Sequence, residues 1–197
     1  MRIFHGFENL PDFVHPAVTV GSFDGVHCGH RALLGRLLEE ARSNGGESIV
    51  LTFEPHPRVT LHTDEGLRLL TTFEEKCALL EAAEVDNLVV IPFDREFSSL
   101  SGRDFIEGYL IGRLGAEVLV AGYNHRFGHD RVASSDPRLA EWIRVVRVGP
   151  CTVDGVRVSS TAIRRLLDEG DRAAAERLAG HPLPAHAAPA HETENRN

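Results

Sequence analysis

The segment AVTVGSFDGVHCGH, residues 17–30, joins a predicted buried strand to a predicted long helix through a glycine-rich turn. Its apolar beginning, Ala17–Ser22, has strand length and little alternation of polarity, which is typical of a strand buried on both faces. Helical periodicity follows over Arg31–Asn44. Ligands of open α/β sheets bind where such a strand ends and its helix begins, so this turn is the first candidate site.

Strands and helices continue to alternate along the rest of the chain. Apolar runs predict four further strands: Ser48–Phe53, Asn87–Phe93, Glu117–Gly122 and Ile143–Val148. Helical spacing of apolar residues covers Thr72–Ala83 and Gly102–Leu114. Alternating strands and helices indicate right-handed βαβ units. We therefore expect an α/β fold with a Rossmann-like, doubly wound, five-stranded parallel sheet and helices on both faces.

The C-terminal part predicts two short helices and then a tail. Hydroxyl caps at Ser159–Thr161 begin a helix that runs through Leu167, and Arg172–Ala179 forms the next. From Gly180 onward small residues alternate with proline, without apolar periodicity. We expect one domain over residues 1–182 and a disordered tail over 183–197. A metal site is the alternative for three evenly spaced tail histidines, His181, His186 and His191.

Composition excludes several classes of protein. A formal net charge of −8 argues against sequence-independent binding of nucleic acid, which needs a clustered basic face. The three cysteines are odd in number and show no CxxC spacing, which fits a reducing cytoplasm. No stretch approaches the ~18 apolar residues of a membrane span. We expect a cytoplasmic protein without membrane or nucleic-acid partners.

The turn itself has the chemistry of an anion site. Glycines at 21, 25 and 29 allow positive φ angles and let backbone amides approach a ligand. The positive end of the following helix favours phosphate. His27 and His30 are three residues apart, so both imidazoles can face one point at the helix entrance. These residues predict a phosphate-binding site.

Other kinds of site could use a turn of this composition. No Gly-Lys-Ser/Thr follows, which excludes a P-loop, and the glycine spacing does not match the GxGxxG of dinucleotide folds. A zinc site would combine His27 and His30 with Cys28 or Asp24. A purely structural turn with two incidental histidines is the last alternative. It is disfavoured because paired imidazoles in a glycine-rich turn are an unusual way to build a plain loop.

Four motifs in order resemble one protein family. Gly21–His30 is similar to the HxGH signature of the nucleotidyltransferase superfamily, in the form GxFDGVHxGH of the adenylyltransferase module of bacterial bifunctional riboflavin kinase/FAD synthetases. Thr52–Pro57 resembles that family's TFxPHP segment, and Gly122–Gly128 its G-x-(D/N)-x-x-FG loop. Val158–Arg164 resembles its ISSTxIR helix start. The set is specific and covers nearly all of the chain that we expect to be ordered.

The resemblance implies a reaction. A phosphate oxygen of FMN attacks the α-phosphorus of ATP in line, which gives FAD and pyrophosphate without a covalent enzyme intermediate. Mg²⁺ is expected with ATP, held mainly by substrate phosphates and water, so no metal ligands are assigned. The family's kinase domain would follow the last helices, but the sequence ends 17 residues beyond Gly180. We therefore expect a separate riboflavin kinase to supply FMN.

The resemblance also assigns residues. His27, His30 and Arg164 are the expected catalytic groups, because donors beside helix-terminal amides would stabilise the transferring phosphate and its leaving group. The other expected ATP contacts are Gly21, Ser22, Phe23, Asp24, Gly25, Gly29, Gly122, Asn124, Arg126, Phe127, Arg157, Ser159, Ser160 and Thr161. The expected flavin contacts are Phe53, Pro55, His56 and Pro57, a segment stiffened by its prolines.

Two alternatives to FMN adenylylation remain. The first keeps adenylyl or cytidylyl transfer but uses another phosphorylated acceptor, as in the pantetheine-phosphate and glycerol-phosphate branches of the superfamily. The second is a non-catalytic sensor of flavin or nucleotide. The PHP and SSTxIR segments favour FMN, and the presence of every expected catalytic residue argues against a sensor.

Overall fold

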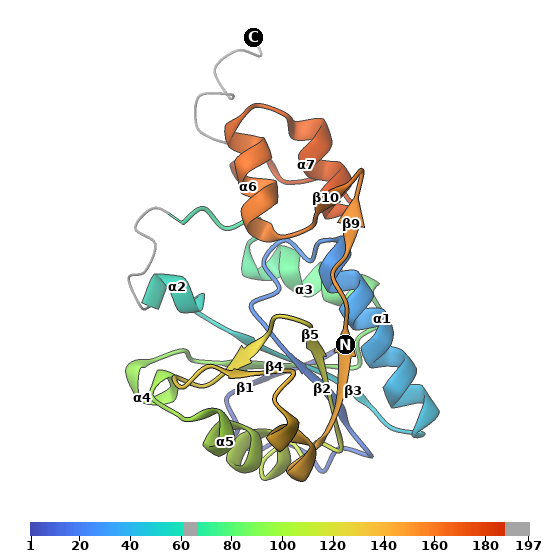
Figure 1. The fold of residues 1–197 in the computed structure, drawn as a ribbon, viewed down its shortest axis with the longest axis vertical. Coiled ribbons are helices and arrows are strands. Elements are labelled where there is room, and N and C mark those ends of the chain that lie inside the picture. The colour runs from blue at the N-terminus through green and yellow to red at the C-terminus, as the bar shows by residue number, and fades with distance from the viewer. Residues whose placement is uncertain (61–66, 188–197) are drawn as a thin grey trace.

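The computed structural model describes residues 1–60 and 67–187. Its main sheet has six parallel strands in the order β1-β4-β3-β2-β5-β8. Figure 1 shows this sheet in the lower part of the molecule. The strands are β1 (Arg2–His5), β2 (Ala17–Val20), β3 (Ser48–Phe53), β4 (Asn87–Ile91), β5 (Val118–Gly122) and β8 (Arg144–Val148). The predicted doubly wound parallel sheet is confirmed.

The expected number of five strands is wrong, because β1 adds a sixth at one edge. This strand is short and mostly exposed, so its sequence RIFH lacks the apolar run that marks the central strands. It pairs with β4 in parallel register, Ile3 opposite Leu88. The backbone N–H of Gly6 extends the pairing by donating to the carbonyl of Val90 at 2.8 Å. Pairing at an edge, rather than burial, makes this segment a strand.

Helices cover both faces of the sheet, as predicted. On one face, helices α1 (Cys28–Ser43) and α3 (Phe73–Ala82) pack through Leu37 and Leu80 against strand residues such as Val50. On the other face, the short helix α5 (Gly102–Asp104) continues into the π-helix η1 (Phe105–Ile111). Ile106 and Leu110 of η1 contact the alternate strand residues. Because successive strand residues point to opposite faces, each apolar run supplies both cores.

Two helix starts are fixed by side-chain caps. The backbone N–H of His30 donates to Nδ1 of His27 at 3.2 Å, so α1 begins at Cys28, three residues earlier than expected. Thr72 and Glu75 form a reciprocal capping box at the start of α3. The remaining elements are short: α2 (Pro57–Thr60), α4 (Arg95–Ser98), β6 (Arg126–Phe127), β7 (Val132–Ala133), η2 (Pro137–Glu141), β9 (Thr152–Val153) and β10 (Val156–Arg157). None of the described helices is long and apolar enough to cross a membrane.

The last two helices, α6 (Ser160–Asp168) and α7 (Arg172–Ala179), form a unit at the far end of the molecule in Figure 1, with a core of their own. Leu183 and Ala187, in the segment with the 3-10 helix η3 (Ala185–Ala187), are buried in this core. Residues 183–187 are therefore folded, and the expectation that a disordered tail begins at 183 is wrong for them. Single buried side chains between prolines leave no periodic signal. The rest of the expected tail, 188–197, lies outside the described residues.

Candidate active site

A cavity of about 400 Å³ lies at the carboxyl ends of β2, β5 and β8. Three segments far apart in the sequence meet there: the turn after β2, the loop after β5 and the first turn of α6. The cavity thus occupies the edge of the sheet where open α/β folds bind ligands. Thirteen residues expected to bind ATP line it, namely Gly21, Ser22, Phe23, His27, Gly29, His30, Gly122, Asn124, Arg157, Ser159, Ser160, Thr161 and Arg164.

The other expected site residues lie behind or beside this cavity. His56 is the one member of the expected flavin set that lines it among the described residues. Phe53 instead packs against Phe93, with ring centroids 5.2 Å apart. Arg126 lines an adjoining hollow that shares Asn124 with the cavity. The remaining residues that do not line the cavity are Asp24, Gly25, Pro55, Pro57 and the buried Phe127.

The structure also adds lining residues that the sequence did not single out. Arg58 lies two residues beyond His56, and its backbone N–H donates to Nδ1 of that histidine at 3.2 Å. Tyr123 flanks Asn124, and the guanidinium of Arg157 lies 5.3 Å from the centre of its ring. The added lining residues are Val20, Leu33, Arg58, Tyr123, His125, Val148, Gly149, Pro150, Cys151 and Val158. Adjacency to a predicted motif was the available signal for most of them.

The two histidines of the turn are stacked. Their ring centroids are 3.7 Å apart and the ring planes differ by 8°. Because Nδ1 of His27 accepts the hydrogen bond from the His30 backbone, the neutral ring carries its proton on Nε2. Burial lowers the pKa of His27 to about 4. Burial, and then the neighbouring His27, hold the pKa of His30 well below its usual value. Both rings are therefore neutral at neutral pH, and each offers an N–H donor.

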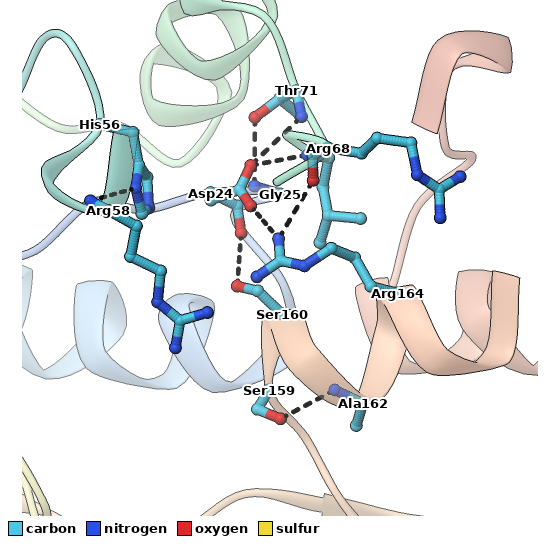
Figure 2. Close-up of polar contacts among 11 residues, drawn as sticks. Asp24, Gly25, His56, Arg58, Arg68, Thr71, Ser159, Ser160, Ala162 and Arg164 are labelled. Carbon is cyan, nitrogen blue, oxygen red and sulfur yellow. Dashed lines mark hydrogen bonds and ion pairs between the residues drawn. The ribbon is translucent and has the colours of Figure 1, made fainter. Parts of the chain in front are cut away.

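Asp24 ties the turn to neighbouring segments, as Figure 2 shows. Its carboxylate pairs with Nη1 of Arg164 at 2.6 Å and accepts from the backbone N–H of Leu70 at 2.8 Å. Its backbone carbonyl accepts from the hydroxyl of Ser160 at 3.0 Å. Asp24 thus holds the turn against the start of α6, and part of the function of Arg164 is to hold it there.

The first turn of α6 offers donors to the cavity. Ser159 caps the helix, since its hydroxyl accepts from the backbone N–H of Ala162 at 3.1 Å. Within the described chain the hydroxyl of exposed Thr161 makes no hydrogen bond, although Thr161 lines the cavity. A helix start with uncommitted donors is a general anion site, and helix dipole and amides act together there. This helix start lies beside the glycine-rich turn, because Ser160 and Arg164 both bond to Asp24.

A zinc site at the turn is not supported by this geometry. Asp24 is committed to Arg164 and to the backbone of Leu70. The thiol of Cys28 points to the other side, with its Sγ 3.7 Å from the carbonyl oxygen of Arg177. In the described part of the chain, no three His, Cys, Asp or Glu side chains are grouped so that they could hold a metal ion.

The lowered histidine pKa values predict how stability depends on pH. His27 and His125 have pKa values of about 4 because of burial, against 6.5 for an ordinary histidine. Between these values the unfolded chain binds more protons than the folded chain, so the free energy of unfolding decreases as pH falls from 6.5 to 4. Above pH 6.5 the histidines are neutral in both the folded and the unfolded chain, so this loss of stability is absent. Urea unfolding across the range measures it.

His125→Gln removes one of the groups that cause this dependence. The slope of unfolding free energy against pH should decrease by up to about 1.4 kcal/mol per pH unit, the value for one proton. His129→Gln is the control, because the side chain of His129 is exposed on the loop after β6, four residues further along the chain. Equal slopes for His125→Gln and the unsubstituted protein would show that folding does not lower the pKa of His125.

Comparisons with known sequences match the chain to one protein family. The model of the FAD synthetase family matches residues 12–162. The bifunctional riboflavin kinase/FMN adenylyltransferase of Escherichia coli (strain K12) is 35% identical over 188 residues, which cover 92% of this chain and 60% of that protein. The protein of the same name from Pseudomonas fluorescens is 35% identical over 187 residues, with the same coverage. The chain thus spans about three fifths of the length of these relatives.

Solved structures agree on the fold. A Streptococcus pneumoniae structure described as a macrolide-efflux protein superposes with a TM-score of 0.82 at 26% identity, covering 92% of this chain and 62% of that one. Pantothenate synthetase from Thermus thermophilus has a TM-score of 0.50 at 18% identity, over 91% of this chain and 81% of that one, and shows a shared fold. Since the family model covers most of the chain, this protein belongs to the FAD synthetase family.

Proposed function

We propose that this protein transfers AMP from ATP to FMN and releases FAD and pyrophosphate. One observation carries the proposal: the stacked His27 and His30 and the first turn of α6 line the same cavity. Two sets of anion donors at one cavity suit a substrate with several phosphates. Family membership and the FMN adenylyltransferase activity named in the relatives support FMN as the acceptor.

ATP would lie with its phosphates between the two sets of donors. We place the β- and γ-phosphates at the backbone amides of the first turn of α6 and at the hydroxyl of Thr161, with Arg157 as a counter-charge. The α-phosphate would then face the Nε2–H of His27. Asn124 lines the cavity from the loop after β5, and we place adenosine on this side. Mg²⁺ would enter with ATP and shield the charge of its phosphates.

Chemistry in this site consists of positioning and charge stabilisation. An oxygen of the FMN phosphate forms a bond to the α-phosphorus of ATP while the bond from that phosphorus to the bridging oxygen breaks, and pyrophosphate leaves. Neutral imidazole donors stabilise the charge that develops on the α-phosphate without needing a proton transfer. We place His56 and Arg58 on the acceptor side, because both line the cavity and lie in or next to the segment expected to contact flavin.

We place the protein in the cytoplasm, where ATP and FMN are available for the proposed reaction. The three cysteines, Cys28, Cys77 and Cys151, are all free thiols, which fits a reducing compartment.

Incubation with ATP, Mg²⁺ and either FMN or riboflavin tests the proposal, with FAD and pyrophosphate followed by chromatography. We expect FAD from FMN and none from riboflavin alone. If FMN gives no FAD, the proposed reaction is wrong, and calorimetry then separates the alternatives. Binding of FMN without turnover indicates a sensor, whereas binding of ATP without binding of FMN indicates another phosphorylated acceptor.

A further inference from the structure

The turn that carries the histidine pair has an unfavourable backbone. Phe23 and Val26 have φ angles of 49° and 33°, and Gly25 has a φ of 80°. A non-glycine residue at positive φ costs on the order of 1–3 kcal/mol and persists where surrounding contacts determine it. Gly25 is also tightly packed, because a Cβ atom there would lie 2.8 Å from Cδ1 of Leu70. The conformation of this turn must therefore be imposed by its neighbours.

Two neighbouring segments, helix α6 and residues 70–71, bond to Asp24 and Gly25 in the first half of the turn. Asp24 is bonded to Arg164 and to the backbone of Leu70. The backbone N–H of Gly25 donates to the hydroxyl oxygen of Thr71 at 3.1 Å. These contacts leave the carbonyl of Gly25, the last group before Val26 and His27, to be fixed from another direction.

His181 supplies that contact from the C-terminal segment. Its Nε2 lies 2.8 Å from the carbonyl oxygen of Gly25, and its Nδ1 lies 2.8 Å from the carbonyl oxygen of Pro182. Both partners are carbonyl oxygens, which can only accept, so the hydrogen bond to Gly25 requires a proton on Nε2. The two bonded residues are 156 positions apart in the sequence. One imidazole therefore connects the segment after α7 to the turn of the candidate active site.

The segment that carries His181 is itself well anchored. Gly180 ends α7 in a left-handed conformation, with φ at 76°, and a Cβ there would meet Sγ of Cys28 at 2.7 Å. Two residues beyond His181, the backbone N–H of Leu183 donates to Glu176 at 3.1 Å, and its carbonyl accepts from Arg172. The side chain of Leu183 is buried. His181 is thus held on a rigid support from both sides.

We propose that His181 is a positioning residue for adenylyl transfer, which orients the Gly25–His27 turn so that the paired imidazoles face the phosphates of ATP. This inference rests on the proposed function. The α6–α7 unit would then have two roles, since it carries phosphate donors in α6 and also holds the turn in place. The unit holds the turn at two points, through Asp24 from α6 and through Gly25 from the segment after α7.

The experiment compares three variants of the full chain. His181→Ala removes the donor, and we expect kcat/KM for ATP to fall about 3- to 10-fold, as for the loss of one hydrogen bond, with KM for FMN unchanged. His181→Gln keeps an N–H donor on a side chain of similar reach and should recover most of the loss. His186→Ala is the control, because His186 is exposed in the same segment and only approaches Glu75 at 3.6 Å. It should match the unsubstituted protein.

Each outcome decides the proposal. Unchanged kinetics in His181→Ala, or an equal loss in His181→Gln and His181→Ala, would overturn it, the latter because it indicates a general packing role. If the unsubstituted protein makes no FAD, the proposed function fails but the positioning role can still be measured. Calorimetry with ATP and Mg²⁺ then compares the same variants. Weaker ATP binding in His181→Ala with recovery in His181→Gln supports the role, and equal affinities refute it.

Discussion

Substitution of His30 by alanine should reduce the turnover of FMN and ATP to FAD by about 100- to 1,000-fold, the typical cost of removing one donor that stabilises a transferring group. His30 stacks on His27 at 3.7 Å and also contacts Phe23, with ring centroids 5.0 Å apart. Its removal therefore deletes one donor and loosens the other. Steady-state rates with saturating ATP and FMN measure the effect.

His129→Ala is the control for this prediction. The side chain of His129 is exposed on the loop after β6, so its removal should leave turnover unchanged. We expect His30→Ala to remain folded, because the void that it leaves opens into the cavity. Circular dichroism and thermal unfolding measure this. A folded His30→Ala variant with near-normal turnover would contradict the role assigned to the histidine pair.

Much of the fold could be predicted because it follows from local patterns. Central strands such as β3 are buried on both faces, so their apolar runs are unmistakable. Edge strand β1 was missed because partial exposure breaks that pattern. The folded segment at Leu183 was missed for a related reason. A few buried side chains between prolines have no period, and their packing depends on the α6–α7 core that the local sequence does not reveal.

The sequence predicts which segments form the site better than it predicts the side-chain contacts between them. A glycine-rich turn and a serine-capped helix at opposite ends of the chain could both be expected to bind phosphate, and the sheet topology brings them together. The contacts of His181 and Asp24 could not be predicted. Asp24 has the residue type of a ligand group, yet its carboxylate is turned away from the cavity to Arg164. Side-chain direction in a turn of positive φ angles is set by tertiary contacts.

Substitution of Asp24 by asparagine should destabilise the protein by about 3–5 kcal/mol, the usual cost of removing one member of a buried ion pair. The side chain of Asp24 is 3% exposed and that of Arg164 is 14% exposed, so Arg164 would keep a charge with little access to water. An amide can still accept from the backbone N–H of Leu70, which limits the change to the charge. Urea unfolding at neutral pH measures the loss.

Asp168→Asn is the matched control, because Asp168 pairs with Arg68 at the surface, where its side chain is 54% exposed. Surface pairs contribute about 0–1 kcal/mol, so this variant should unfold almost like the unsubstituted protein. Equal losses in Asp24→Asn and Asp168→Asn would show that the buried pair does not hold the turn. A loss confined to Asp24→Asn, together with weaker ATP binding in the fraction that stays folded, would show that the stability of this turn and its affinity for phosphate depend on the same contact.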